Sequence, residues 1–594
     1  MPSKRSLTNP QGDNRMINEQ RKLGLALSGG GFRASFFHIG VMARLAEKDL
    51  LRSIEVLSCV SGGSIIGALY YLHVKRLLES KQDRDITKND FVTLMQQVEV
   101  EFLRGVQTNL RVRAFSNFGK NWRMLRKSYS RSDRMAELYD KAFYDQVAAH
   151  PRISLTEVKI QPLGANEQFH PRKHNKDRRA KVPMLVINAT TLNTGRSWQF
   201  TAVDMGEREP EQEVQAFDKN LILSSLRFDQ QQLPDEKYRH VPLSVAVAAS
   251  ACVPGIFPPL ALTGLYPNVV PQLVDGGVHD NQGISSILYE QCTDIVVSDA
   301  SGQLESVEEP KRGTISILGR TNGILMARVR NQGLESLHIR QKAGEVEHAP
   351  ILHLKEEVAL ERLEPGASRA KGEDNGVSLT SYGMNKNVQR CLSEIRTDLD
   401  SFTDTEAFSL MFSGYMMAGK MIGQGLAESY LPTIDGQLSN PKDEAGVQWR
   451  FVAIRDKAES HQESNDYTLN LRTAHNTVFK VYSLGPKFIP LGVLIAIVGL
   501  GVPLALVALA CYFVFGILNI SPWWFAAAAI LLILPGLLGI KSAEEKWGNN
   551  VLSYVVTGSI ALGGSLLAYL HLKFIDPIFL KYGRVGASLK STGT

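Results

Sequence analysis

Near its start, the 594-residue chain shows the same local pattern twice: an apolar strand, a glycine-rich turn and a helix. The first unit covers residues 23–48 and has Gly29-Gly30-Gly31 at its turn, and the second covers residues 54–77 and has Ser61-Gly62-Gly63 at its turn. Each apolar run is short enough for a buried strand, and each following segment has helical spacing. Alternating units of this kind predict a mostly parallel sheet with helices on both faces, so we expect a three-layer α/β fold.

Strand patterns return at residues 184–189, 272–274 and 294–298, and helix patterns at residues 244–251 and 405–421. We find no internal repeat. The composition changes sharply after Lys487, where apolar residues become concentrated. We therefore divide the chain into a disordered lead-in (1–21), a main body (22–425), a connecting region (426–487), a membrane segment (488–572) and a tail (573–594).

The membrane segment is predicted from three apolar stretches. Residues 488–518 and 551–570 contain no charged side chain, and residues 523–540 are almost entirely apolar. A helix needs roughly 20 apolar residues to cross a bilayer. We therefore expect about three C-terminal transmembrane helices that make the chain an integral membrane protein with a cytoplasmic body; a buried soluble helical core is the alternative. Three spans would leave the basic tail outside, so a re-entrant stretch or an even number of spans is left open.

The charge of the chain is mildly basic, since 66 Lys and Arg against 60 Asp and Glu give a net charge of +6. Basic and aromatic residues are mixed over residues 100–135, which is typical of a membrane-surface segment or lid and equally of a solvated cap helix. Neither this segment nor the basic run at residues 171–181 carries a recognition motif, so we expect no nucleic-acid binding. The five cysteines show no metal-ligand spacing, and we expect them to be reduced packing residues.

Ser61 lies between a predicted strand and a predicted helix, within Cys59-Val60-Ser61-Gly62-Gly63. A nucleophile elbow has this context, because small neighbours permit the sharp turn that exposes the serine hydroxyl at a helix N-terminus. The usual pattern is G-x-S-x-G, and Cys59 replaces its first glycine. Taken alone, this motif leaves an ordinary strand–helix connection as the alternative.

Two further motifs supply groups that an acyl-transfer serine requires. Gly29-Gly30-Gly31 has no side chains, so its backbone N–H groups can face a cavity and hold an oxyanion. A phosphate-binding loop is the competing interpretation, but the G-x-x-x-x-G-K-[ST] pattern is absent. Asp275 follows the strand pattern of residues 272–274 and precedes two glycines. A carboxylate there could act as the base if it lies within about 3 Å of the hydroxyl, and a simple Asp-Gly turn is the alternative.

Together, these motifs resemble those of the patatin-like phospholipases, whose pattern is a GGGxR loop, a G-x-S-x-G serine and a DG[GA] aspartate in this order. The resemblance covers residues 22–425 and includes similar segments at residues 188–190, 194–196 and 247–259. It departs from the family at Cys59 and at Ala34, where glycine is common, and both changes could alter turn geometry and rate. The matching residues are Gly29-Gly30-Gly31-Phe32-Arg33, Cys59-Val60-Ser61-Gly62-Gly63 and Asp275-Gly276-Gly277.

The resemblance implies a carboxylic ester hydrolase with a Ser–Asp dyad rather than a triad. Ser61 would attack the acyl carbonyl and Asp275 would take its proton, with no metal or organic cofactor. His38 and His279 occupy no triad position, and we expect both to be packing residues. The implied oxyanion hole comprises the amides of Gly29, Gly30, Gly31 and Gly62, with Arg33 in a supporting role.

The implied substrate is a membrane lipid, either a phospholipid or a lysophospholipid. A neutral lipid or a small ester remains an alternative, because the motifs do not separate these esters. A catalytically silent lipid-binding module on a membrane domain is a further alternative, and the presence of both Ser61 and Asp275 argues against it. The sequence gives no prediction of oligomeric state.

Overall fold

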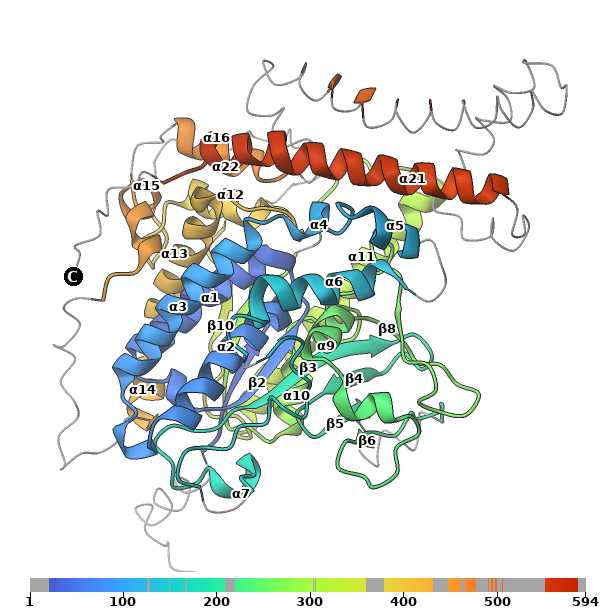
Figure 1. The fold of residues 1–594 in the computed structure, drawn as a ribbon. Helices are drawn as coiled ribbons and strands as arrows, with labels where there is room; N and C mark the ends of the chain where they lie inside the picture. Colours follow the sequence, from blue (N-terminus) through green and yellow to red (C-terminus); the bar gives the residue numbers. More distant parts are fainter. Residues whose placement is uncertain are drawn as a thin grey trace, which may run out of the picture.

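A computed structural model describes the chain from residue 21 to residue 585, with gaps. Its centre is a ten-stranded mixed sheet with the path β10-β9-β1-β2-β3-β4-β5-β6, in which β8 pairs with β3 and β7 pairs with β8 (Figure 1). The gaps are residues 125–128, 149, 166–167, 209–218, 303, 305, 359–378, 431–446, 461–464 and 477–550, the last with isolated described positions between 490 and 505.

The strands from β10 to β3 run parallel, and the remaining pairs are antiparallel. Because the carboxyl ends of parallel strands share one edge, the turns after β1 and β2 meet at that edge, which we call the catalytic edge. The parallel strands are β1 (Leu23–Leu27), β2 (Ile54–Val60), β3 (Met184–Thr191), β9 (Asp294–Asp299) and β10 (Ile351–His353). The others are β4 (Ser197–Phe200), β5 (Asp204–Glu207), β6 (Leu226–Arg227), β7 (Leu260–Ala261) and β8 (Gln272–Asp275).

Successive side chains of a strand point to opposite faces, and the sheet therefore has a core on each side. Leu25 and Leu27 belong to a large core with α1, α2, α3, α9 and α13, whereas Ala26 belongs to a smaller one with α10 and α11. Helices thus flank the sheet on both faces, which confirms the predicted α/β architecture. The bounds are α1 (Gly31–Glu47), α2 (Gly62–Ser80), α3 (Lys88–Val106), α9 (Leu243–Ser250), α10 (Ile284–Tyr289), α11 (Thr314–Lys342) and α13 (Asp404–Met421).

The smaller helices lie outside these layers. The basic and aromatic segment at residues 100–135 forms the end of α3 followed by α4, α5 and the start of α6, and two of its cations, Lys120 and Arg134, pair with Glu137. The bounds of the remaining helices are α4 (Leu110–Arg113), α5 (Phe118–Met124), α6 (Arg131–Tyr139), α7 (Pro171–His174), α12 (Lys386–Glu394), α14 (Gln424–Tyr430), α15 (Arg455–Ala458), α16 (Asn465–Thr473), α21 (Val551–Leu570) and α22 (Asp576–Tyr582).

The predicted transmembrane helices find no support in the part of the chain that the structure describes. None of its described helices is both long and apolar enough to cross a bilayer. The predicted spans at residues 488–518 and 523–540 lie outside the described residues, apart from isolated positions. The third is α21, which lies across the body in Figure 1 and packs on α5. There the Asn121 amide donates to the Ala561 carbonyl and to the Ser565 hydroxyl.

Candidate active site

Ser61 forms the sharp turn between β2 and α2. Its backbone has φ 50° and ψ −116°, a left-handed conformation that is uncommon for any residue with a side chain. The turn also requires glycine after the serine, because a Cβ on Gly62 would lie 2.1 Å from the Gly31 carbonyl oxygen. A Cβ on Gly63 would lie 2.3 Å from the Leu27 carbonyl oxygen. This strained strand–helix connection has the conformation of a nucleophile elbow.

Asp275 is the last residue of β8. This strand pairs with the end of β3, on the same side of β3 on which its first part pairs with β2. Asp275 Oδ1 accepts the Gly277 N–H at 2.8 Å, whereas its Oδ2 has no hydrogen-bond partner among the described residues. Burial raises the pKa of Asp275 to about 6, and interactions with the Ser61 hydroxyl and the Gly277 amide lower it. The Ser61 contact falls short of full hydrogen-bond geometry, yet it places the hydroxyl beside the buried carboxylate.

The N-termini of α1 and α2 meet at the glycine loop. Gly31 is the first residue of α1 and Gly62 the first of α2, and the N–H of a first helical residue has no partner within its helix. A Cβ on Gly62 would lie 2.9 Å from the Gly31 nitrogen, so the two amides are close neighbours. Gly30 has φ 135° and Gly31 has φ 58°, conformations that favour glycine. The arrangement can supply donors for an oxyanion next to Ser61.

Gly29 was predicted as an oxyanion donor, and the structure does not support this role. Its N–H donates to the Asn281 carbonyl oxygen at 2.9 Å, so this amide is already engaged. A Cβ on Gly29 would lie 2.3 Å from Asn281 Oδ1, and one on Gly277 would lie 2.5 Å from the same oxygen. Asn281 therefore joins the glycine loop to the Asp275 turn. Gly29 permits the close approach of Asn281, and its N–H does not hold the oxyanion.

Arg33 is an anchor for the glycine loop and is 3 % exposed. Its guanidinium donates to the carbonyl oxygens of Ser393 and Ile395, at 3.0 and 2.7 Å, and to that of Ala300 at 2.9 Å. The guanidinium thus fixes the start of α1 against two other segments of the chain. The supporting role in the oxyanion hole that the resemblance implies stays a prediction.

Ser250 and Asn188 hold the elbow in place, and the three motifs did not predict them as site residues. The Ser250 hydroxyl accepts the Ser61 N–H at 2.9 Å and donates to the Asn188 carbonyl oxygen at 2.5 Å. The Asn188 amide donates to the Cys59 carbonyl oxygen and to the Ser58 hydroxyl, both at 3.0 Å. Both residues lie in segments that resemble the family, which was the available signal.

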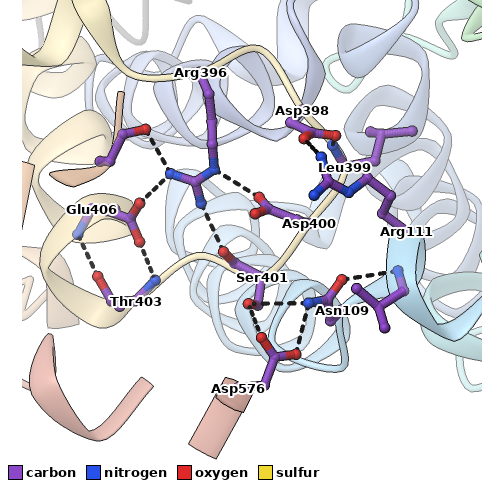
Figure 2. Close-up of polar contacts among 12 residues, drawn as sticks. Asn109, Arg111, Arg396, Asp398, Leu399, Asp400, Ser401, Thr403, Glu406 and Asp576 are labelled. Atoms are coloured by element: carbon purple, nitrogen blue, oxygen red, sulfur yellow. Dashed lines mark hydrogen bonds and ion pairs between the residues drawn. The ribbon is translucent and has the colours of Figure 1, made fainter. Parts of the chain in front are cut away.

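The glycine loop rests on a segment from the distant part of the body. The Asp398 carbonyl oxygen accepts the Phe32 N–H at 3.1 Å, and a Cβ on Gly31 would lie 2.8 Å from the same oxygen. The Asp398 carboxylate pairs with Arg111 of α4, as Figure 2 shows. The position of the oxyanion donors therefore depends on residues that lie well outside the three motifs.

Buried ion pairs and hydrogen bonds fix the rest of this segment (Figure 2). The fully buried Arg396 guanidinium pairs with the carboxylates of Asp400 and Glu406. Asp576, at the start of α22, accepts the Ser401 hydroxyl at 3.0 Å. Residues of the predicted tail thus join the polar network that lies behind the glycine loop.

The contacts of the His38 ring are with groups other than Ser61 and Asp275. The buried His38 ring contacts the Ser298 hydroxyl at 2.6 Å through Nδ1 and the Ser28 carbonyl oxygen at 3.0 Å through Nε2. Burial lowers the pKa of His38 to about 4, and burial also lowers the pKa of His279. A neutral His38 with both nitrogens engaged fits the packing role that we expected.

The described residues offer one group with metal-ligand spacing, formed by Asp294, Glu347 and His348. Its atoms already have protein partners. Arg21 pairs with Glu347, His348 Nδ1 contacts Asp294 at 2.7 Å, and the Tyr430 hydroxyl donates to Asp294 at 2.7 Å. We therefore assign no metal to this group.

Comparison with known proteins gives one match. Residues 25–288 match the sequence profile of the family described as patatin-like phospholipase, and no curated protein matches the chain. The matched segment contains the elbow at Ser61, Gly30 and Gly31 of the glycine loop, and Asp275. The resemblance is confirmed over residues 25–288: this part of the chain is a patatin-like phospholipase domain.

Proposed function

We propose that the chain hydrolyses fatty acyl esters of phospholipids or lysophospholipids through a Ser61–Asp275 dyad. The observation that carries this proposal is the left-handed Ser61 turn beside a buried carboxylate whose pKa is raised to about 6. A carboxylate with this pKa is ionised at neutral pH and is also a better proton acceptor than an ordinary aspartate. These are the properties that a direct general base for serine requires.

The reaction has two halves. Ser61 Oγ attacks the acyl carbonyl carbon while its proton passes to Asp275, and the oxyanion is held by the amides of Gly31 and Gly62, with Gly30 adjacent. Collapse of this intermediate breaks the ester bond, and Asp275 returns the proton to the leaving alcohol. Water then attacks the acyl-serine, giving its proton to Asp275 and releasing the fatty acid when Ser61 is protonated again.

The proposal is tested with phosphatidylcholine vesicles and lysophosphatidylcholine micelles. We expect the purified chain to release fatty acid and Ser61→Ala to lose this activity. The matched control is Ser285→Ala, which changes an exposed serine on α10 and should leave the rate intact. Equal activity of Ser61→Ala and the unchanged chain would overturn the dyad, whereas a preference for triacylglycerol or a soluble ester would reassign only the substrate.

Anchoring of the catalytic body to a membrane is a separate part of the proposal. Its support is the uncharged composition of residues 488–518 and the apolar composition of residues 523–540. Alkaline carbonate extraction of membranes that contain the full chain tests it. An anchored chain stays in the membrane pellet, and complete release into the supernatant would overturn the anchor without affecting the assignment of the dyad.

A further inference from the structure

The first half of α11 is apolar and exposed. Ile317 and Leu318 are 50 and 65 % exposed, and Ile324 and Leu325 are 48 and 55 % exposed. Residues seven positions apart lie on the same side of a helix, so these four side chains form one apolar stripe. Single exposed apolar residues are common on proteins, but a stripe of four along one helix is typical of a contact surface.

This half of α11 extends beyond the catalytic edge of the sheet. Arg330 pairs with Asp299, the last residue of β9, at 3.1 Å, and Leu337 packs in the same core as Ile295 of β9. The helix therefore runs back along β9 from Arg330 onward. The 16 residues from 314 to 329, which we call the α11 arm, reach about 24 Å past that edge. Figure 1 shows α11 reaching past the sheet toward the side of the body that carries α5 and α21.

The end of the arm lies on the same side of the sheet as the glycine loop, because Arg330, the next residue, pairs with Asp299. Ala300 follows β9 directly, and its carbonyl oxygen accepts a hydrogen bond from Arg33. A Cβ on Gly30 would lie 2.8 Å from that same oxygen. Arg330, just after the arm, thus pairs with the residue before Ala300, so the arm extends from the edge of the sheet that carries the glycine loop.

The charge of the arm has one sign. Residues 314–329 contain no aspartate or glutamate, and their charged residues are Arg320 and Arg328; Lys311 and Arg312 precede the arm and follow Glu308 and Glu309. Arg328 lies four residues after Ile324 and three after Leu325, so it is on the same face of the helix as the apolar stripe. An apolar stripe with cations along and beside it suits the boundary between anionic head groups and acyl chains.

We propose that the α11 arm docks on the surface of an anionic lipid bilayer, with Ile317, Leu318, Ile324 and Leu325 entering the acyl boundary. The basic side chains then contact lipid phosphates. This docking turns the catalytic edge toward the lipid. The inference concerns binding alone, and it holds whether or not Ser61 is the nucleophile.

A dye on the arm tests this inference in the full chain. An environment-sensitive fluorophore is attached to Leu325→Cys and, as the matched control, to Ile339→Cys, which is 58 % exposed in the second half of the same helix. Both variants carry Ser61→Ala to prevent hydrolysis and Cys511→Ser to remove a competing thiol. Vesicles of phosphatidylcholine with phosphatidylglycerol should shift the emission of the Leu325 dye to the blue and leave the Ile339 dye unchanged.

This local readout separates the arm from lipid contacts elsewhere in the chain. No shift at Leu325, or equal shifts at both positions, would overturn the proposal. A blue shift that depends on protein concentration without vesicles would also overturn it, because the stripe would then be an interface between copies of the chain.

The basic side chains are tested in a second experiment. Each cation near an anionic surface contributes about fivefold to partitioning, so Arg320→Gln with Arg328→Gln should weaken vesicle binding at the Leu325 dye by about 25-fold. Lys342→Gln, in the second half of α11, is the matched charge control and should have no such effect. Equal binding to pure phosphatidylcholine vesicles would contradict the anionic preference.

Discussion

Replacing Gly62 with alanine should displace the oxyanion donors. A Cβ at this position would lie 2.1 Å from the Gly31 carbonyl oxygen, whereas ordinary contact begins at 3.4 Å. The glycine loop must therefore retreat by roughly 1 Å, which is enough to break hydrogen bonds whose useful length is about 2.7–3.1 Å. Losing one such donor lowers kcat by about 100- to 1,000-fold, with little change in KM, because these amides act on the oxyanion rather than on the bound ester.

Steady-state hydrolysis of p-nitrophenyl butyrate, with a thermal melt of each variant, measures this effect. Gly333→Ala is the matched control, since a Cβ there meets nothing within 4 Å. It should keep its kcat and gain about 0.5–1 kcal/mol of stability, because alanine favours a helix over glycine. A Gly62→Ala protein that folds and has the kcat of the control would refute the assignment of these amides.

Further predictions concern Asp275 and the buried network of Arg396. Because Asp275 must be ionised to accept a proton, kcat/KM should rise with pH up to about 6 and then level off. A rise centred near pH 3.8, the ordinary pKa of an aspartate, would contradict the role of burial. The folded chain holds this proton more tightly than the unfolded chain, so the free energy of unfolding falls as pH rises from 3.8 to about 6. Asp275→Asn should therefore stabilise the protein by up to about 3 kcal/mol above that range, as urea unfolding would show. Arg396→Met, which leaves Asp400 and Glu406 without this buried guanidinium, should destabilise the protein by about 3–5 kcal/mol in the same assay, whereas Arg227→Met at the exposed Asp229 pair should have no measurable effect.

The sequence carried the motifs of the site because each is a local pattern. A strand, small residues and a helix around Ser61 are sufficient to predict a sharp turn, and Asp275 could be placed by the strand before it. Gly29 could not be judged in this way, since its amide is engaged by Asn281, about 250 residues later. Asp398 also supports the glycine loop from a distant segment, and no spacing in the sequence connects the two.

The C-terminal part shows a different limit. Residues 551–570 have the composition of a membrane helix, and their hydropathy alone predicts a transmembrane span. The structure places them on α5, where Asn121 donates to Ala561 and Ser565. Composition shows that a helix has apolar side chains to bury, but it does not show whether lipid or another part of the protein covers them. The same reasoning explains why Asp576, in the predicted tail, was not expected beside Ser401.

The most direct test of the Ser61–Asp275 dyad is the site and rate of labelling by a fluorophosphonate, followed by peptide mass spectrometry. The dyad predicts a single adduct on the peptide that contains Ser61, no adduct in Ser61→Ala, and much slower labelling in Asp275→Asn because the serine loses its base. An adduct on another residue, or labelling of Asp275→Asn at the rate of the unchanged chain, would contradict it.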